Sequence, residues 1–314
     1  MKLVTFSERR TRGFRVGALI DKDGRPFVVD CVRLDPALPA SMRSLLHVLN
    51  GNFTSLAAAV HSAPQDYLFP LADLILGPVV PDPEKVICVG LNYRDHALET
   101  GHALPETPTI FAKYANSLIG SGAAIMIPPN TSQVDYEAEL ACVIGRRAKG
   151  VLQEDSLDYV AGYTIFNDVS ARDYQLRTSQ WTIGKSFDTF GPIGPTLVTA
   201  EDMSNPHALR IRLWIGDERL QDSNTNNLVF KIPELIAHLS SVMTLEPGDV
   251  ISTGTPAGVG FTRKPPRYLR AGDIVRIEIE GLGTLINTVQ ATGSDNSSYG
   301  ADYTASALVD RNLP

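Results

Sequence analysis

Short apolar runs separated by glycine and proline fill the chain from about residue 85 onward, and this spacing constrains the fold most strongly. The 314 residues include 25 glycines and 21 prolines, which interrupt helices and mark turns. The pattern predicts strands at 86–89, 135–144, 160–167, 209–215, 250–253 and 274–279. One helix, with Pro233 in its first turn, is expected among them. The sequence therefore predicts an α+β, strand-rich protein built as a roll or barrel.

The region before residue 85 has a different pattern. Residues 1–32 are typical of short strands with turns, and residues 41–61 of one or two helices. Prolines then cluster between positions 64 and 83, which suits neither a helix nor a central strand. We expect a domain joint at about 70–84, with a small N-terminal α/β domain over 1–77 and a larger catalytic domain over 78–290. Residues 291–314 are rich in Ser, Asn, Asp and Thr and are expected to form a tail.

Composition narrows the possible partners. The formal net charge is −7, and the sequence shows no extended basic cluster, so we expect no nucleic-acid partner. No apolar run approaches the roughly 18 residues of a membrane helix, so no membrane partner is expected. Three cysteines without a CxxC motif, and an N-terminus without a signal-peptide pattern, favour a cytoplasmic protein. Gly184-Lys185-Ser186 resembles a phosphate loop, but the required first glycine is Ser179 here, so no nucleotide cofactor is expected.

Three carboxylates stand at the ends of apolar strands. On a strand over 135–144, Glu137 and Glu139 point to the same side, about 7 Å apart. Asp168 follows the apolar run 160–167. Without a nearby cysteine or histidine, such a group favours Mg²⁺ or Mn²⁺ over zinc. The alternative is a solvated strand end, with Asp168 as a turn residue.

His96 and Glu99 form a second candidate group. If the segment after the strand at 86–89 is helical, the two residues are i and i+3 neighbours on one face. A carboxylate beside an imidazole fixes its tautomer and raises its basicity, as a general base requires. The alternative is an ordinary surface ion pair.

Five motifs together resemble the fumarylacetoacetate hydrolase family. They are Val89-Gly90-Leu91-Asn92-Tyr93-Arg94-Asp95-His96, Asp135-Tyr136-Glu137-Ala138-Glu139-Leu140, Asn167-Asp168-Val169-Ser170-Ala171-Arg172-Asp173, Gly184-Lys185-Ser186-Phe187-Asp188 and Thr253-Gly254-Thr255-Pro256. They follow the family's order over about residues 85–288. The resemblance implies a mixed β-roll catalytic domain of this family's type, preceded by the small N-terminal domain of many bacterial members.

The resemblance also implies roles for individual residues and a dimeric assembly. The implied roles are metal ligation by Glu137, Glu139 and Asp168, water activation by His96 and Glu99 on a segment that orders with substrate, a pocket lysine at Lys185, and substrate contacts at Arg172, Gln175 and Thr255. Some members carry a fourth, aspartate ligand where Asn92 stands here, so three carboxylate ligands for Mg²⁺ or Mn²⁺ are expected. The family also implies a homodimer.

The implied reaction is metal-dependent hydrolysis of a C–C bond in a 2,4-dioxo acid or acylpyruvate, which yields pyruvate or a related 2-oxo acid and a carboxylic acid. Two alternatives use the same metal site: a decarboxylase of oxaloacetate-type acids, and a tautomerase or isomerase of 2-oxo acids. A non-catalytic binding protein that keeps the fold is the remaining alternative. In each enzymatic case the partner is a small oxo acid.

Overall fold

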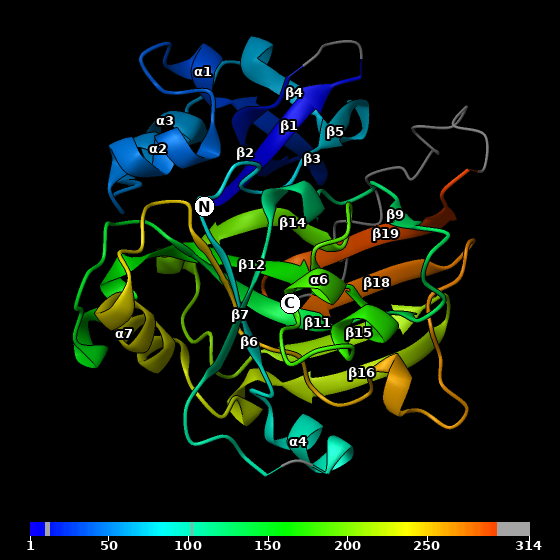
Figure 1. Ribbon diagram of the computed structural model, residues 1–314. Helices are drawn as coiled ribbons and strands as arrows, with labels where there is room; N and C mark the ends of the chain where they lie inside the picture. Colours follow the sequence, from blue (N-terminus) through cyan, green and yellow to red (C-terminus); the bar gives the residue numbers. More distant parts are fainter. Residues whose placement is uncertain (10–12, 102, 294–314) are drawn as a thin grey trace.

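Strands dominate the computed structural model, which describes residues 1–9, 13–101 and 103–293 (Figure 1). They form a 12-stranded mixed sheet, a five-stranded sheet and a two-stranded pair. In the large sheet the neighbours are, in order, β4 (Leu68–Pro70), β3 (Arg25–Asp30), β2 (Arg15–Lys22), β1 (Lys2–Glu8), β14 (Gly191–Thr199), β12 (Val160–Asn167), β11 (Ala138–Ile144), β17 (Val250–Ser252), β6 (Val86–Gly90) and β7 (Thr109–Lys113), with β5 (Leu74–Leu76) on β1 and β8 (Leu118–Ile119) on β14. The strand-rich α+β prediction is confirmed.

The remaining strands complete the roll. The five-stranded sheet consists, in order, of β16 (Glu218–Asn224), β15 (Arg210–Ile215), β18 (Ile274–Ile279), β19 (Gly283–Ala291) and β9 (Ile125–Ile127). The pair is β10 (Val134–Asp135) with β13 (Ser170–Ala171). The predicted strand over 135–144 is therefore interrupted at Tyr136 and Glu137, where the chain leaves β10 and enters β11.

Seven α-helices lie among the described residues. They are α1 (Cys31–Leu34), α2 (Met42–Leu49), α3 (Thr54–His61), α4 (Arg94–Thr100), α5 (Arg172–Gln175), α6 (Thr182–Lys185) and α7 (Ile232–Val242). The segment 41–61 thus forms two helices, and α7 carries Pro233 in its first turn as predicted. Val242, the last residue of α7, is 69 % exposed. None of these helices is long and apolar enough to cross a bilayer.

Strand β11 is buried on both faces and separates two hydrophobic clusters. Leu140 and Cys142 belong to the larger cluster, which includes much of the five-stranded sheet. Ala141 and Val143 belong to the second cluster, together with Leu46 and other N-terminal residues. Because successive side chains of a strand point to opposite faces, Glu139 shares the side of Ala141 and Val143, and Glu137 lies directly before the strand. This alternation explains why apolar residues occupy both sets of positions.

Main-chain pairing joins the N-terminal region to the larger one. Strand β1 is antiparallel to β14, with Lys2 opposite Val198 and Leu3 opposite Leu197. Figure 1 shows α2 and α3 at the end of the molecule farthest from α4. The domain boundaries at 77 and 290 stay a prediction. Of the expected tail, only 291–293 lie within the described residues, and Ala291 is the last residue of β19.

Candidate active site

Three buried carboxylates meet where β11 and β12 lie side by side. The antiparallel register pairs Ala138 with Asn167, so Glu137 before β11 and Asp168 after β12 become neighbours. The Asp168 amide donates to the Glu137 carbonyl at 3.0 Å. One oxygen each from Glu137, Glu139 and Asp168 lies within 4.8 Å of the others. The three residues are 5, 2 and 0 % exposed, so the alternative of solvated glutamates is wrong.

Cationic side chains surround two of the three carboxylates. Lys185 Nζ lies 2.7 Å from Glu137 Oε2 and 2.8 Å from Asp168 Oδ2. Arg172 Nη2 lies 2.7 Å from Glu137 Oε1, and Lys113 Nζ lies 2.7 Å from Asp168 Oδ1. Burial alone would raise the pKa of Glu137, but Lys185 and Arg172 outweigh it and hold this pKa at about 2. Both carboxylates are therefore paired with fixed positive charge.

Among the described residues, Glu139 accepts hydrogen bonds from neutral donors only. Its Oε2 accepts hydrogen bonds from Ser252 Oγ at 2.5 Å and from the Gly254 amide at 2.9 Å. Burial, followed by the charges of Asp168 and Glu137, raises the pKa of Glu139 well above its ordinary value. A third buried carboxyl group that pairs with no cation among the described residues fits a site for a divalent ion, because carboxylate oxygens suit Mg²⁺ and Mn²⁺. The donor set thus fits the predicted metal.

Asn92 does not join this set. Its Nδ2 donates to the carbonyls of Phe230 and Thr253 at 3.1 and 2.7 Å, and its Oδ1 accepts from the Phe230 amide at 2.8 Å. The side chain therefore fastens the chain after β6 to the segment before α7. Among the described residues, the possible metal ligands are three carboxylates, as expected.

Helix α4 places His96 next to Glu99. His96 Nδ1 lies 3.2 Å from Glu99 Oε2, and His96 is only 6 % exposed. The surface-pair alternative is therefore wrong for the imidazole. Burial would raise the pKa of Glu99, but hydrogen bonds from His96, Thr262 and the Gly258 amide lower it. His96 also contributes to the low pKa of Glu137, which places it within electrostatic reach of the carboxylates.

The three predicted substrate contacts lie around the same cluster. Arg172 and Gln175, both on α5, are joined by a hydrogen bond of 2.9 Å from Nη1 to Oε1. Thr255 follows Gly254, whose amide binds Glu139. Its hydroxyl accepts from Gln221 Nε2 at 2.9 Å, which leaves its hydrogen free to donate. The structure therefore brings all nine predicted site residues around one centre.

Sequence reasoning missed three buried polar residues that support the site. Lys113 ends β7 and binds both Asp168 and the Val169 carbonyl. Asp135 binds Arg172 Nε at 2.8 Å, and Gln221 binds Thr255. A lone lysine after the apolar run of β7 was a usable signal for Lys113. Nothing in the local sequence distinguishes Gln221 from an ordinary polar residue of a hairpin.

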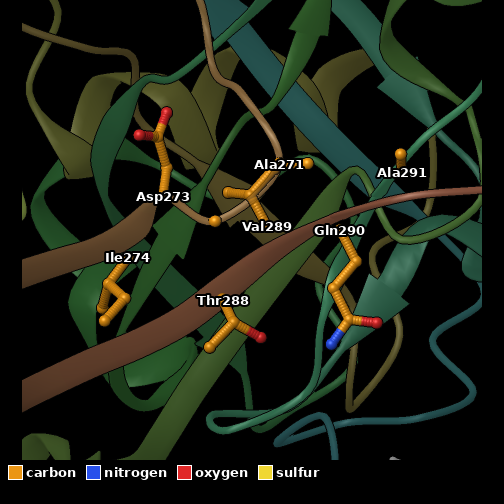
Figure 2. Close-up of a pocket in the computed structure, with 8 residues that line it drawn as sticks. Ala271, Asp273, Ile274, Thr288, Val289, Gln290 and Ala291 are labelled. Atoms are coloured by element: carbon orange, nitrogen blue, oxygen red, sulfur yellow. The ribbon is translucent and has the colours of Figure 1, made fainter. Parts of the chain in front are cut away.

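A separate surface pocket lies between the turn before β18 and strand β19. Figure 2 shows its lining, which includes Asp273, Thr288 and Gln290. The one charged group of this lining, Asp273, is already bound by Arg267 Nη2 and the Arg270 amide, both at 2.8 Å. The pocket therefore offers no free charged group comparable with the carboxylate cluster.

Comparisons with known proteins define the class. The fumarylacetoacetate (FAA) hydrolase C-terminal model matches residues 85–290. The chain belongs to the fumarylacetoacetate hydrolase family, and the prediction of this family is confirmed. It is 44 % identical over 291 residues to the mitochondrial oxaloacetate tautomerase fahd2 of Xenopus laevis, covering 92 % of this chain and 90 % of that protein.

Two solved structures share the architecture. The fumarylacetoacetate hydrolase of the psychrophilic Exiguobacterium antarcticum is 34 % identical with a TM-score of 0.78, covering 93 % of this chain and 99 % of that chain. The maleylpyruvate hydrolase of Sphingobium sp. SYK-6, in complex with manganese(II) and pyruvate, is 34 % identical with a TM-score of 0.75 and the same coverage. The chain is thus an enzyme of a family that contains both isomerases and hydrolases.

Proposed function

We propose that this protein is a divalent-metal-dependent tautomerase that interconverts the enol and keto forms of an oxaloacetate-type 2-oxo acid. The observation that carries the proposal is the 44 % identity to an oxaloacetate tautomerase over nine-tenths of both chains. The carboxylate cluster with His96 beside it supplies the chemistry. This support favours the tautomerase alternative over the C–C hydrolase that we expected first.

Glu137, Glu139 and Asp168 would hold Mg²⁺ or Mn²⁺. A bound ion supplies a Lewis acid that polarises the C2 oxygen of a 2-oxo acid. The protein's own part is to keep three carboxyl groups together in a buried place. Lys185, Arg172 and Lys113 balance two of them through the contacts described above. The third, Glu139, is left for the ion.

His96 is the proposed proton carrier. Its bond to Glu99 favours the tautomer with hydrogen on Nδ1, which leaves a lone pair on Nε2. From the enol side, a proton leaves the C2 hydroxyl, the electron pair shifts to form the C2 carbonyl, and C3 takes a proton. The reverse direction removes the proton from C3. No water is consumed, and substrate and product have the same mass.

Lys185 is proposed as a fixed positive charge. Burial would lower its pKa, but Asp168 and Glu137 outweigh burial and raise it, so the ammonium form persists at neutral pH. An ammonium group stabilises negative charge that develops on the substrate oxygen. Arg172, Gln175 and Thr255 are proposed to orient the substrate carboxylate and its neighbouring oxygen.

C–C bond hydrolysis is the second candidate. It is supported by the likeness to the maleylpyruvate hydrolase described above. In this reaction His96 would activate a water molecule instead of carrying a substrate proton. The same residues serve both reactions, so product analysis has to separate them.

The test is a substrate panel with identified products. Purified protein with Mn²⁺ is given enol oxaloacetate, maleylpyruvate and a simple acylpyruvate, and products are identified by NMR and mass spectrometry. We expect faster loss of the oxaloacetate enol with unchanged mass. Release of CO₂ would indicate a decarboxylase instead. Cleavage of an acylpyruvate to pyruvate and a carboxylic acid, with no effect on the enol, would overturn the proposal in favour of hydrolysis.

We further propose a homodimer, which the family resemblance implies, and a cytoplasmic location, which the sequence favours. Light scattering at micromolar concentration tests the first, and a monomer would contradict it. Microscopy of the tagged full chain tests the second.

A further inference from the structure

We propose that residues 258–262, here called the 258–262 loop, couple helix α4 to Arg172, and that buried Asp135 is the positioning residue for this coupling. The catalytic meaning of the coupling rests on the function proposed above. The contacts themselves do not depend on which reaction the site performs.

Asp135 binds the loop and the arginine with the same carboxylate. Its Oδ1 accepts from the Gly260 amide at 2.7 Å, and its Oδ2 accepts from the Phe261 amide at 3.0 Å. The same Oδ2 accepts from Arg172 Nε at 2.8 Å. The Arg172 guanidinium also lies over the Phe261 ring, 4.4 Å from its centroid. Asp135 is 0 % exposed, so these charge-assisted bonds form away from water.

The first and last residues of the same loop bind α4. Glu99 Oε1 accepts from the Gly258 amide at 3.0 Å and from Thr262 Oγ1 at 2.9 Å. The other oxygen of Glu99 contacts His96. One chain of contacts therefore runs from the imidazole through Glu99 and the loop to Asp135 and Arg172. None of the hydrogen bonds of Asp135 among the described residues reaches α4.

Close packing leaves the loop little freedom to move independently. A Cβ at Gly260 would lie 2.0 Å from the Arg267 carbonyl oxygen and 2.5 Å from Asp135 Oδ1, so only glycine fits there. Tyr136 Oη donates to the Gly258 carbonyl at 3.2 Å. A loop held this tightly transmits a displacement at one side to the other, because packed elements shift together.

The Thr262 hydroxyl can keep a hydrogen bond when α4 moves away from the 258–262 loop. Its single hydroxyl hydrogen has two acceptors at 2.9 Å, Glu99 Oε1 and the Val259 carbonyl. When Glu99 departs, the hydrogen can stay on Val259. The docked and released positions of α4 then differ by few net hydrogen bonds, which suits a helix that moves to admit substrate.

The test uses hydrogen–deuterium exchange of the full protein without substrate. Asp135→Asn keeps the size of the side chain but removes its charge. We expect exchange to rise about fivefold or more in 258–262 and also in 94–100, although Asp135 does not touch α4. The matched control is Asp249→Asn, since Asp249 is equally buried, accepts from two amides and pairs with Lys85. It should leave 94–100 unchanged.

Thr262→Val supplies the second arm and keeps the proposal testable if Asp135→Asn does not fold. It removes the contact to Glu99 without touching Arg172. We expect faster exchange in 94–100 and a lower kcat with KM nearly unchanged. In the double variant the two effects on 94–100 should be less than additive, because both act through one loop.

The coupling would be overturned if Thr262→Val left exchange in 94–100 unchanged. It would also be overturned if Asp135→Asn raised exchange in 258–262 but not in 94–100. So would full additivity in the double variant. These readouts need no substrate, so they remain valid if oxaloacetate is not turned over. Failure of the proposed function and failure of the coupling are therefore distinguishable.

Discussion

The carboxylate cluster and helix α4 meet at one site but are held in opposite ways. Glu137 and Asp168 are buried and bound by three cationic side chains. Helix α4 buries His96 and Ala97, and its other contacts are polar ones at its edge. Examples are the bond from Ser223 Oγ to Asp95 and the bond from Arg94 to the Leu228 carbonyl. Leu98 on this helix is 82 % exposed.

This difference indicates that the carboxylate cluster is rigid and that α4 can move. Taking charges out of water costs several kcal/mol per ion unless they are paired, so a paired cluster is a rigid part of the fold. Single hydrogen bonds at a half-exposed edge contribute only about 1 kcal/mol each. The rigid part suits a metal site, and the weakly held part suits a proton carrier that closes over substrate.

The largest effects on stability and metal binding are expected from substitutions within the carboxylate cluster. Asp168→Asn leaves Lys113 and Lys185 without a full partner and should cost about 3–5 kcal/mol of stability. Glu139→Gln removes the carboxylate that has no cation, so stability should change by less than about 1 kcal/mol. Both should abolish Mn²⁺ binding and turnover. Calorimetric metal titration and thermal unfolding check this, and equal destabilisation by both variants would contradict it.

A smaller effect is expected in α4. His96→Ala should lower kcat by about 10²- to 10⁴-fold, the usual size of a proton-transfer contribution. Mn²⁺ affinity should stay the same, because His96 is not among the three ligand candidates. Leu98→Ala, on the exposed face of the same helix, is the control and should change neither quantity. Near-normal turnover in His96→Ala would make His96 and Glu99 a structural pair only.

The smallest effect concerns His207, which belongs to neither the carboxylate cluster nor α4. His207 Nε2 accepts from the Ile232 amide at 3.2 Å, and burial followed by the charge of Lys231 lowers its pKa to about 4. The unfolded chain protonates near pH 6.5, so this stability is complete above pH 6.5 and lost as pH falls toward 4.

Because His207 is half exposed, we expect about 1–2 kcal/mol from this residue. His207→Asn does not titrate and should flatten the dependence of unfolding free energy on pH between 6.5 and 4. Denaturant unfolding at several pH values measures it. An unchanged slope in the variant would show that other groups control acid stability.

Much of the fold follows from local pattern. Strand β12, strand β18 and strand β15 match their predicted apolar runs to within one residue at either end. Strand β14 was missed because Pro192 and Pro195 lie inside it, and proline normally marks an edge or a turn. Its place in the large sheet depends on tertiary pairing with β1 and β12.

For the site, too, local features could be predicted from the sequence, but contacts between distant residues could not. The spacing of Glu137 and Glu139 in the predicted strand indicated a shared side, although β11 itself begins only at Ala138. Their burial was not readable, since it depends on Lys185 arriving from another element. Asp135 was read as part of a strand, and its bonds to Gly260 and Phe261 span about 125 positions of sequence. Long-range partners of this kind leave no local pattern.

The most direct measurement is the rate of enol-to-keto conversion of oxaloacetate with Mn²⁺ in the wild type, His96→Ala and Glu139→Gln, with Mn²⁺ binding measured on the same samples. We predict rapid conversion only in the wild type, with Mn²⁺ bound by the wild type and His96→Ala but not by Glu139→Gln. Conversion in the wild type no faster than with Mn²⁺ alone would contradict the account, as would wild-type rates in both variants.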